Sequence, residues 1–136
     1  MSYQFNTGCS LHNLKGIRDF VRKALDQEGI NEITTGEIVL ALDEMCSNLM
    51  IHAHHCNPDD SLGIRITRGD RQHIIFEIID KGNVFDINQF QTPDLDNLIH
   101  QKRKGGLGIR LVKSIMDEVE YLNRDGSTVC RLTKKV

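Results

Sequence analysis

Two pairs of predicted strands constrain the fold of this chain most strongly. The first pair comprises residues 62–67 and 73–79, which are joined by the turn-forming residues 68–71. Residues 119–123 and 128–133 repeat this arrangement around Asp125-Gly126, a favoured hairpin dipeptide. With a further short strand expected over 3–7, the sequence predicts a mostly antiparallel sheet whose apolar face needs a second layer to cover it.

Three segments with helical spacing of apolar residues can supply that layer. Residues 11–27 form the first, with Gly29 as a stop signal, and residues 35–54 form the second. Thr34 with Glu37 reads as a capping box, and Ile33 with Ile38 as a hydrophobic staple at the start of this second helix. A third helix is expected after a glycine cluster near 105–108. The predicted class is α+β: a two-layer sandwich of a mostly antiparallel, mixed sheet with helices on one face.

Composition excludes several classes of protein. The chain has 136 residues, a net charge of −2 and 39% hydrophobic residues, which predicts one globular domain over residues 1–136. A protein that binds nucleic acid directly without sequence preference needs a basic surface, which this charge does not provide. The longest apolar run, 38–42, is too short to span a membrane, and the N-terminus does not resemble a signal peptide. We therefore expect a cytoplasmic protein.

The four cysteines agree with a reducing compartment. No two of them form a Cys-x-x-Cys pair, so free thiols are the favoured interpretation. A zinc site made by His52, His55 and Cys56 is an alternative, although no matching ligand pair is found elsewhere in the sequence. Histidines near the end of a helix also suit the negative end of its dipole.

Polar residues that can carry chemistry lie first on the second helix. Glu44, Asn48 and His52 are spaced i, i+4 and i+8, which places them along one stripe of an α-helix. A carboxylate can act as a general base, and an amide oxygen is a suitable ligand for Mg²⁺. The alternative is an ordinary polar helix face.

Two further patches follow along the chain. Asp80 ends an apolar strand two residues before Gly82, where a half-buried carboxylate can accept hydrogen bonds from a ligand. The alternative there is plain turn chemistry. The run Gly105-Gly106-Leu107-Gly108 then enters a helix, whose exposed backbone N–H groups can bind an anion. This run matches neither the P-loop nor the dinucleotide fingerprint.

The order of these patches resembles the GHKL (Bergerat-fold) ATPases. More closely, residues 40–48 and 106–113, together with the segment 116–121, resemble the RsbW-type anti-sigma factor serine-protein kinases. The resemblance covers nearly the whole chain, from the first helix to Thr128.

The resemblance implies a role for each matching residue. Glu44 acts as the base or water-orienting residue in phosphoryl transfer, and Asn48 holds Mg²⁺ against the phosphates of ATP. Asp80 accepts a hydrogen bond from the exocyclic amine of adenine. Gly82 lines the same pocket, and Thr128 lies near the adenine.

The phosphate-binding part follows in the same way. Gly106, Leu107 and Gly108 belong to the phosphate-facing turn, and residues 86–104 form the lid over ATP. The motif of this family reads Asp-x-Gly-x-Gly, whereas Val84 stands here at the second glycine. Because valine disfavours positive φ, the hinge of the lid must differ in this chain.

The resemblance also implies a function and partners. We expect an anti-sigma factor that uses ATP and Mg²⁺ to phosphorylate a STAS-type anti-sigma factor antagonist, binds a sigma factor and forms a homodimer. One alternative is a non-catalytic module in which nucleotide only selects the protein partner. Another is the detached ATP-binding domain of a histidine kinase, although no dimerisation helix with a phosphoacceptor precedes Tyr3.

Overall fold

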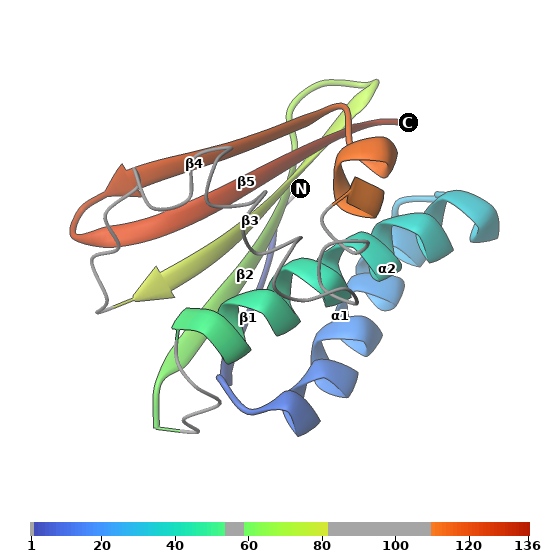
Figure 1. The fold of residues 1–136 in the computed structure, drawn as a ribbon. Helices are drawn as coiled ribbons and strands as arrows, with labels where there is room; N and C mark the ends of the chain where they lie inside the picture. The colour runs from blue at the N-terminus through green and yellow to red at the C-terminus, as the bar shows by residue number, and fades with distance from the viewer. Residues whose placement is uncertain (1, 54–58, 82–109) are drawn as a thin grey trace.

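Five strands form a single antiparallel sheet in the computed structural model, which describes residues 2–53, 59–81 and 110–136 (Figure 1). The strands are β1 (Ser2–Gly8), β2 (Ser61–Arg68), β3 (His73–Lys81), β4 (Glu118–Arg124) and β5 (Ser127–Lys135). Their order across the sheet is β1-β2-β3-β5-β4, and every pair of neighbours is antiparallel. The predicted strands and hairpins are confirmed, and no parallel pair occurs among these five strands.

The helices lie on one side of this sheet, as Figure 1 shows. They comprise a 3₁₀ turn (Leu11–Asn13), α1 (Leu14–Gln27), α2 (Glu32–Asn48), a π-helix (Leu49–Ala53) and a helical turn at 110–115. The predicted two-layer α+β class is therefore confirmed. No helix in the described parts of the chain is long and apolar enough to cross a membrane.

The start of α2 differs from the prediction. Asn31, not Thr34, caps the helix: its side-chain oxygen accepts a hydrogen bond from the Thr34 backbone N–H at 2.8 Å. Ile33 is 80% exposed while Ile38 is fully buried, so the predicted hydrophobic staple is wrong. The helix begins three residues earlier than expected because Asn31 is as good a cap as a threonine.

Turn chemistry fixes the second hairpin. Asp125 and Gly126 both have positive φ, 52° and 77°, as a two-residue type I′ turn requires. Arg124 therefore pairs with Ser127, and this pairing sets the register of β4 against β5.

Three rows of residues on the core-facing side of the sheet cross all five strands, and a shorter fourth row contains Arg68, Ile74 and Lys134. The first row is apolar and contains Tyr3, Ile66, Phe76, Leu132 and Val119. The second row is also largely apolar and contains Phe5, Ile64, Ile78, Cys130 and Tyr121. The third row, which we call the polar row, contains Thr7, Leu62, Asp80, Thr128 and Asn123.

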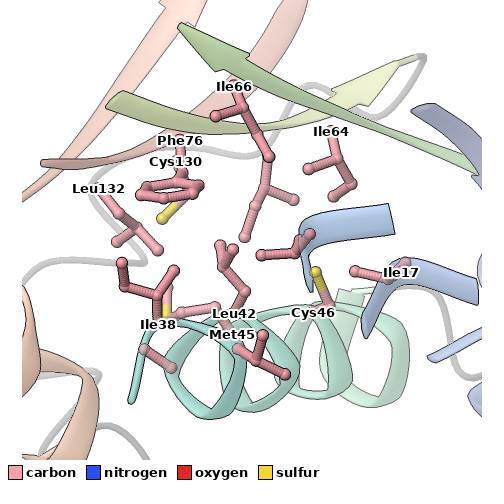
Figure 2. Packing of buried hydrophobic residues seen from close by; sticks show 14 of the residues in the cluster. Ile17, Ile38, Leu42, Met45, Cys46, Ile64, Ile66, Phe76, Cys130 and Leu132 are labelled. Atoms are coloured by element: carbon pink, nitrogen blue, oxygen red, sulfur yellow. The ribbon is translucent and has the colours of Figure 1, made fainter. Parts of the chain in front are cut away.

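The helices pack on the two apolar rows. Figure 2 shows side chains of α1 and α2 opposite those of the sheet, among them Ile17, Leu42 and Cys46 facing Ile64 and Phe76. The buried apolar and thiol side chains of this region form one hydrophobic cluster. Polar side chains replace the apolar ones at the polar row.

Candidate functional site

The candidate site begins with Asp80 and Thr128 in the polar row. The two residues are direct partners on β3 and β5, and only 1% and 4% of their surfaces are exposed. Their neighbours one row further into the core are Ile78 and Cys130, which are also buried. A carboxylate is seldom buried at the edge of an apolar core unless hydrogen bonds or a ligand compensate it. The structure thus brings together two residues that the sequence predicted for adenine binding.

The segment after β1 forms another part of this region. The Cys9 backbone N–H donates to the Asp60 carbonyl at 3.1 Å, which ties the end of β1 to the start of β2. Burial raises the pKa of the Cys9 thiol to about 12, and the negative charges of Asp80 and Asp60 contribute to this rise. Asp80 therefore lies close enough to Cys9 to act on its ionisation. On this side, Thr7 of β1 and Leu62 of β2 continue the polar row beyond Asp80.

The last turn of α2, which contains Cys46, lies over the same end of the core. Burial raises the pKa of the Cys46 thiol, and the nearby Cys130, Asp43 and Cys9 groups raise it further. Figure 2 shows Cys46 on α2 and Cys130 on the sheet, facing the same core. Since Cys130 is one row away from Thr128, this packing brings α2 near the polar row.

Glu44 and Asn48 are one helical turn apart on α2 and are both partly buried. Burial raises the pKa of Glu44, and the neighbouring charge of Asp43 raises it further. Asp43 itself accepts a hydrogen bond from Arg18 of α1 at 2.8 Å. Glu44 is thus a carboxylate with increased proton affinity, a property that suits a general base.

The amide nitrogen of Asn48 is buried and has no hydrogen-bond partner in the described parts of the chain. Leaving such a donor unsatisfied costs about 1–3 kcal/mol. The orphaned amide therefore indicates that a group outside the described residues binds it.

The helix changes its geometry directly after Asn48. Residues Leu49–Ala53 form a π-helix, which has more residues per turn than an α-helix and often occurs at functional sites. The α-helical stripe predicted for Glu44, Asn48 and His52 therefore ends at Asn48. Periodicity alone gave no sign of this change.

Several predicted residues lie outside the described residues. They comprise Gly82, Val84, the lid at 86–104, and the turn residues Gly106, Leu107 and Gly108. The proposed zinc ligands His55 and Cys56 also lie outside them. Among the described residues, no group of three metal-ligating side chains occurs, and Cys9, Cys46 and Cys130 are free thiols.

Asn123 is a polar-row residue that the sequence analysis missed. It pairs with Thr128, so its side chain is on the same face of the sheet as those of Thr128 and Asp80. The type I′ turn at Asp125-Gly126 already implied this pairing, because a two-residue turn places residue 123 opposite residue 128. The register of this hairpin could therefore have identified Asn123 as a neighbour of Thr128 from the sequence.

Comparison with known proteins agrees with this arrangement. A family model described as a histidine kinase-like ATPase domain matches residues 9–134. The chain belongs to this family. The match includes both helices and most of the sheet, and the family implies the use of ATP.

Individual relatives are serine kinases. The chain is 33% identical over 100 residues to the serine-protein kinase RsbW of Bacillus subtilis, an alignment that covers 68% of this chain and 60% of that protein. It is 31% identical over 97 residues to the serine/threonine-protein kinase BtrW of Bordetella bronchiseptica. This second alignment covers 71% of this chain and 67% of that protein. The chain thus spans less than two thirds of the length of the RsbW relative.

A solved structure shares the fold. The crystal structure of the RsbU and RsbW domains of a Mycobacterium tuberculosis protein matches with a TM-score of 0.68 and covers 98% of this chain and 32% of that one. The two sequences are 14% identical in this alignment, so the likeness concerns the fold. The predicted resemblance to GHKL ATPases of the RsbW type is confirmed.

Proposed function

We propose that this chain is an ATP-dependent serine-protein kinase that regulates transcription as an anti-sigma factor. In this proposal it phosphorylates a STAS-type anti-sigma factor antagonist, binds a sigma factor and acts as a homodimer. The observation that carries the proposal is the buried pair Asp80 and Thr128 at the end of the core, beneath the helix that bears Glu44 and Asn48. The similarity to RsbW and BtrW supports the reaction type.

Asp80 provides specificity for adenine in this proposal. Its carboxylate accepts a hydrogen bond from the exocyclic amine, and Thr128 offers a hydroxyl on the adjacent strand. Guanine presents a carbonyl oxygen at the position of that amine, so it faces the carboxylate with a second acceptor. The site therefore favours ATP over GTP.

Asn48 provides the contact to the metal and phosphates. Its amide oxygen is a hard ligand that suits Mg²⁺, and its buried amide nitrogen can donate to a phosphate oxygen. This donor has no partner among the described residues, which supports the fit. ATP would supply the γ-phosphoryl group, and Mg²⁺ would neutralise part of its charge.

Glu44 provides the general base. It is one helical turn from Asn48, so both side chains extend from the same side of α2. A carboxylate there can take the proton from an incoming serine hydroxyl, a contribution of typically 10²–10⁴-fold in rate. Glycines Gly82, Gly106 and Gly108, with Leu107, complete the nucleotide site in this proposal.

Calorimetry with Mg-ATP and Mg-GTP tests the adenine contact. Asp80→Asn should weaken ATP binding by about 1.5–3 kcal/mol, the value of a hydrogen bond to a charged group. Asp19→Asn, an exposed position on α1, is the matched control and should bind ATP as the wild type does. Equal affinities of the wild type for ATP and GTP would contradict the assignment of Asp80.

Transfer of label from γ-labelled ATP to a co-expressed STAS protein tests the reaction. Glu44→Ala should bind ATP normally but lose phosphate transfer, whereas Glu37→Ala, an exposed position on the same helix, should transfer at the wild-type rate. Asn48→Ala should weaken the binding of Mg-ATP itself. If the wild type binds ATP and both protein partners but never transfers phosphate, the non-catalytic partner-switching module is the correct function.

A further inference from the structure

We propose that Asn123 is a second base-contacting residue, whose side-chain amide donates a hydrogen bond to ring nitrogen N3 of adenine. This inference rests on the proposed function, because it requires a purine bound at Asp80. It adds a specificity-determining residue on β4, the strand at the edge of the sheet.

The sheet register places Asn123 in line with the two buried site residues. Asn123 pairs with Thr128, and Thr128 pairs with Asp80, so the three side chains share the core-facing side of β4, β5 and β3. Paired residues in antiparallel strands have Cα atoms about 4.5–5.5 Å apart, which puts Asn123 about 10 Å from Asp80. That span accommodates a purine edge with a hydrogen bond at each end.

The order of chemical groups along this row matches the order along the purine. If the exocyclic amine of adenine faces Asp80, the next groups around the six-membered ring are N1, the C2–H carbon and N3. Both nitrogens are acceptors. Thr128 has a hydroxyl that can donate to N1, and Asn123 has an amide that can donate to N3.

Solvent exposure also increases along the row from Asp80 through Thr128 to Asn123. Asp80 and Thr128 are buried, whereas Asn123 is exposed at the edge of the sheet. The side chain of Asn123 makes no hydrogen bond within the described parts of the chain, so its amide is available to a ligand. Asn123 thus lies where the row opens toward solvent.

Asn6 provides a matched control on the opposite face of the sheet. It is an exposed asparagine on β1, the other edge strand, and it pairs with Gly63. Gly63 in turn pairs with Ile79, which is adjacent in sequence to Asp80 and therefore points away from the polar row. Asn6→Ala removes the same chemical group far from the proposed base.

The test measures the dissociation constants of Mg-ATP, Mg-3-deaza-ATP and Mg-2′-deoxy-ATP for the wild type and three variants. Asn123→Ala should weaken the binding of ATP and 2′-deoxy-ATP about five-fold, the value of one neutral hydrogen bond, and leave 3-deaza-ATP binding unchanged. Asn123→Asp should weaken ATP binding at least as much, because it places an acceptor opposite N3. Asn6→Ala should bind all three nucleotides as the wild type does.

Three results would overturn the inference. Equal weakening of ATP and 3-deaza-ATP by Asn123→Ala means that N3 is not the partner, and a loss confined to nucleotides with a 2′-hydroxyl means that the ribose is. Unchanged ATP affinity means that Asn123 makes no contact. In each case, ATP binding that still depends on Asp80 leaves the proposed function intact. A wild type that does not bind ATP overturns both.

Discussion

Replacing Glu77 with glutamine tests an ion network on the face of the sheet opposite the helices. Glu77 is in the middle of β3, and its side chain is only 7% exposed. Its Oε2 atom accepts hydrogen bonds from Arg124 at 2.9 Å and from Arg131 at 3.1 Å, and Arg65 lies 3.9 Å from Oε1. These arginines come from β4, β5 and β2, so one carboxylate connects four strands.

The size of the expected destabilisation depends on how much solvent reaches the ion pairs of Glu77. Hydrogen bonds to charged groups contribute about 1.5–3 kcal/mol each, which gives an upper bound of about 3–6 kcal/mol for the bonds from Arg124 and Arg131. Both arginine side chains are about one third exposed, 38% and 31%, so solvent screens part of this interaction. Glutamine also keeps the shape and one acceptor. We therefore expect Glu77→Gln to lower the free energy of unfolding by about 2 kcal/mol at pH 7.

The effect should depend on pH in a defined direction. Burial by itself raises the pKa of Glu77, but hydrogen bonds and charge from Arg124 and Arg131 outweigh it and hold the pKa below its ordinary value of 4.5. A carboxylate with a lowered pKa in the folded state contributes stability above its unfolded pKa. This contribution is lost as the pH falls through the folded pKa. The difference between wild type and Glu77→Gln should therefore be constant near pH 7 and shrink below pH 4.5.

Urea unfolding followed by circular dichroism from pH 7 to pH 3.5 measures this difference. Glu120→Gln is the control, because Glu120 is on β4 with its side chain 44% exposed and 4.0 Å from Arg131. The control should change the unfolding free energy by less than about 0.5 kcal/mol. If Glu77→Gln destabilises the protein equally at every pH, the loss arises from packing and the electrostatic reasoning is wrong.

Three further predictions concern other parts of the molecule. Asn31→Ala should lower the free energy of thermal unfolding by about 1 kcal/mol and Thr34→Ala clearly less, because Asn31 supplies the cap of α2. Similar losses for the two variants would mean that the capping box predicted from Thr34 contributes to the helix start. Ile78→Ala should cost about 2–5 kcal/mol in urea unfolding, since the side chain is fully buried, and a loss below about 1 kcal/mol would mean that the core closes around it. In a pH profile of phosphate transfer, Asp43→Asn should move the acid limb to lower pH, because the charge of Asp43 raises the pKa of Glu44. An unmoved limb would mean that Glu44 does not control the rate.

Much of the fold could be predicted because local signals agreed with one another. The dipeptide Asp125-Gly126 can adopt positive φ at both positions, and this property fixed both the turn and the register of β4 with β5. Apolar residues also alternate along 62–66 and mark the buried face of that strand, whereas the run Ile74-Ile75-Phe76 does not alternate. The class of fold follows from these two signals.

The start of α2 was harder to predict because two caps compete there. Thr34 with Glu37 matches a capping box, and Asn31 matches a simple cap three residues earlier. The sequence does not state which one forms. The chain adopts the earlier cap and leaves Ile33 exposed, so the apparent staple has no packing partner at that position.

Long-range features of the site were beyond sequence reasoning for a different reason. The π-helix after Asn48 has no periodic signature, because it contains a single turn. The Glu77 network depends on arginines that are 12, 47 and 54 residues away in the chain, and no local pattern selects them. The predicted roles of Glu44, Asn48, Asp80 and Thr128 stay predictions until the variants are measured.

The two buried carboxylates of β3 show how register can separate structure from function. Glu77 and Asp80 are three residues apart, so a strand that alternates its side chains must place them on opposite faces of the sheet. Glu77 faces three arginines, which neutralise it and hold four strands together. Asp80 is in the polar row, whose other members carry no charge, whereas the cations on the core-facing side, Arg68 and Lys134, pair with Ile74 toward the other end of β3. A one-residue shift in the register of β3 would exchange the two environments. Asp80 would then face the arginines, and Glu77 would place its carboxylate in the core. The register that stabilises the sheet is therefore the same register that leaves Asp80 facing the proposed nucleotide site.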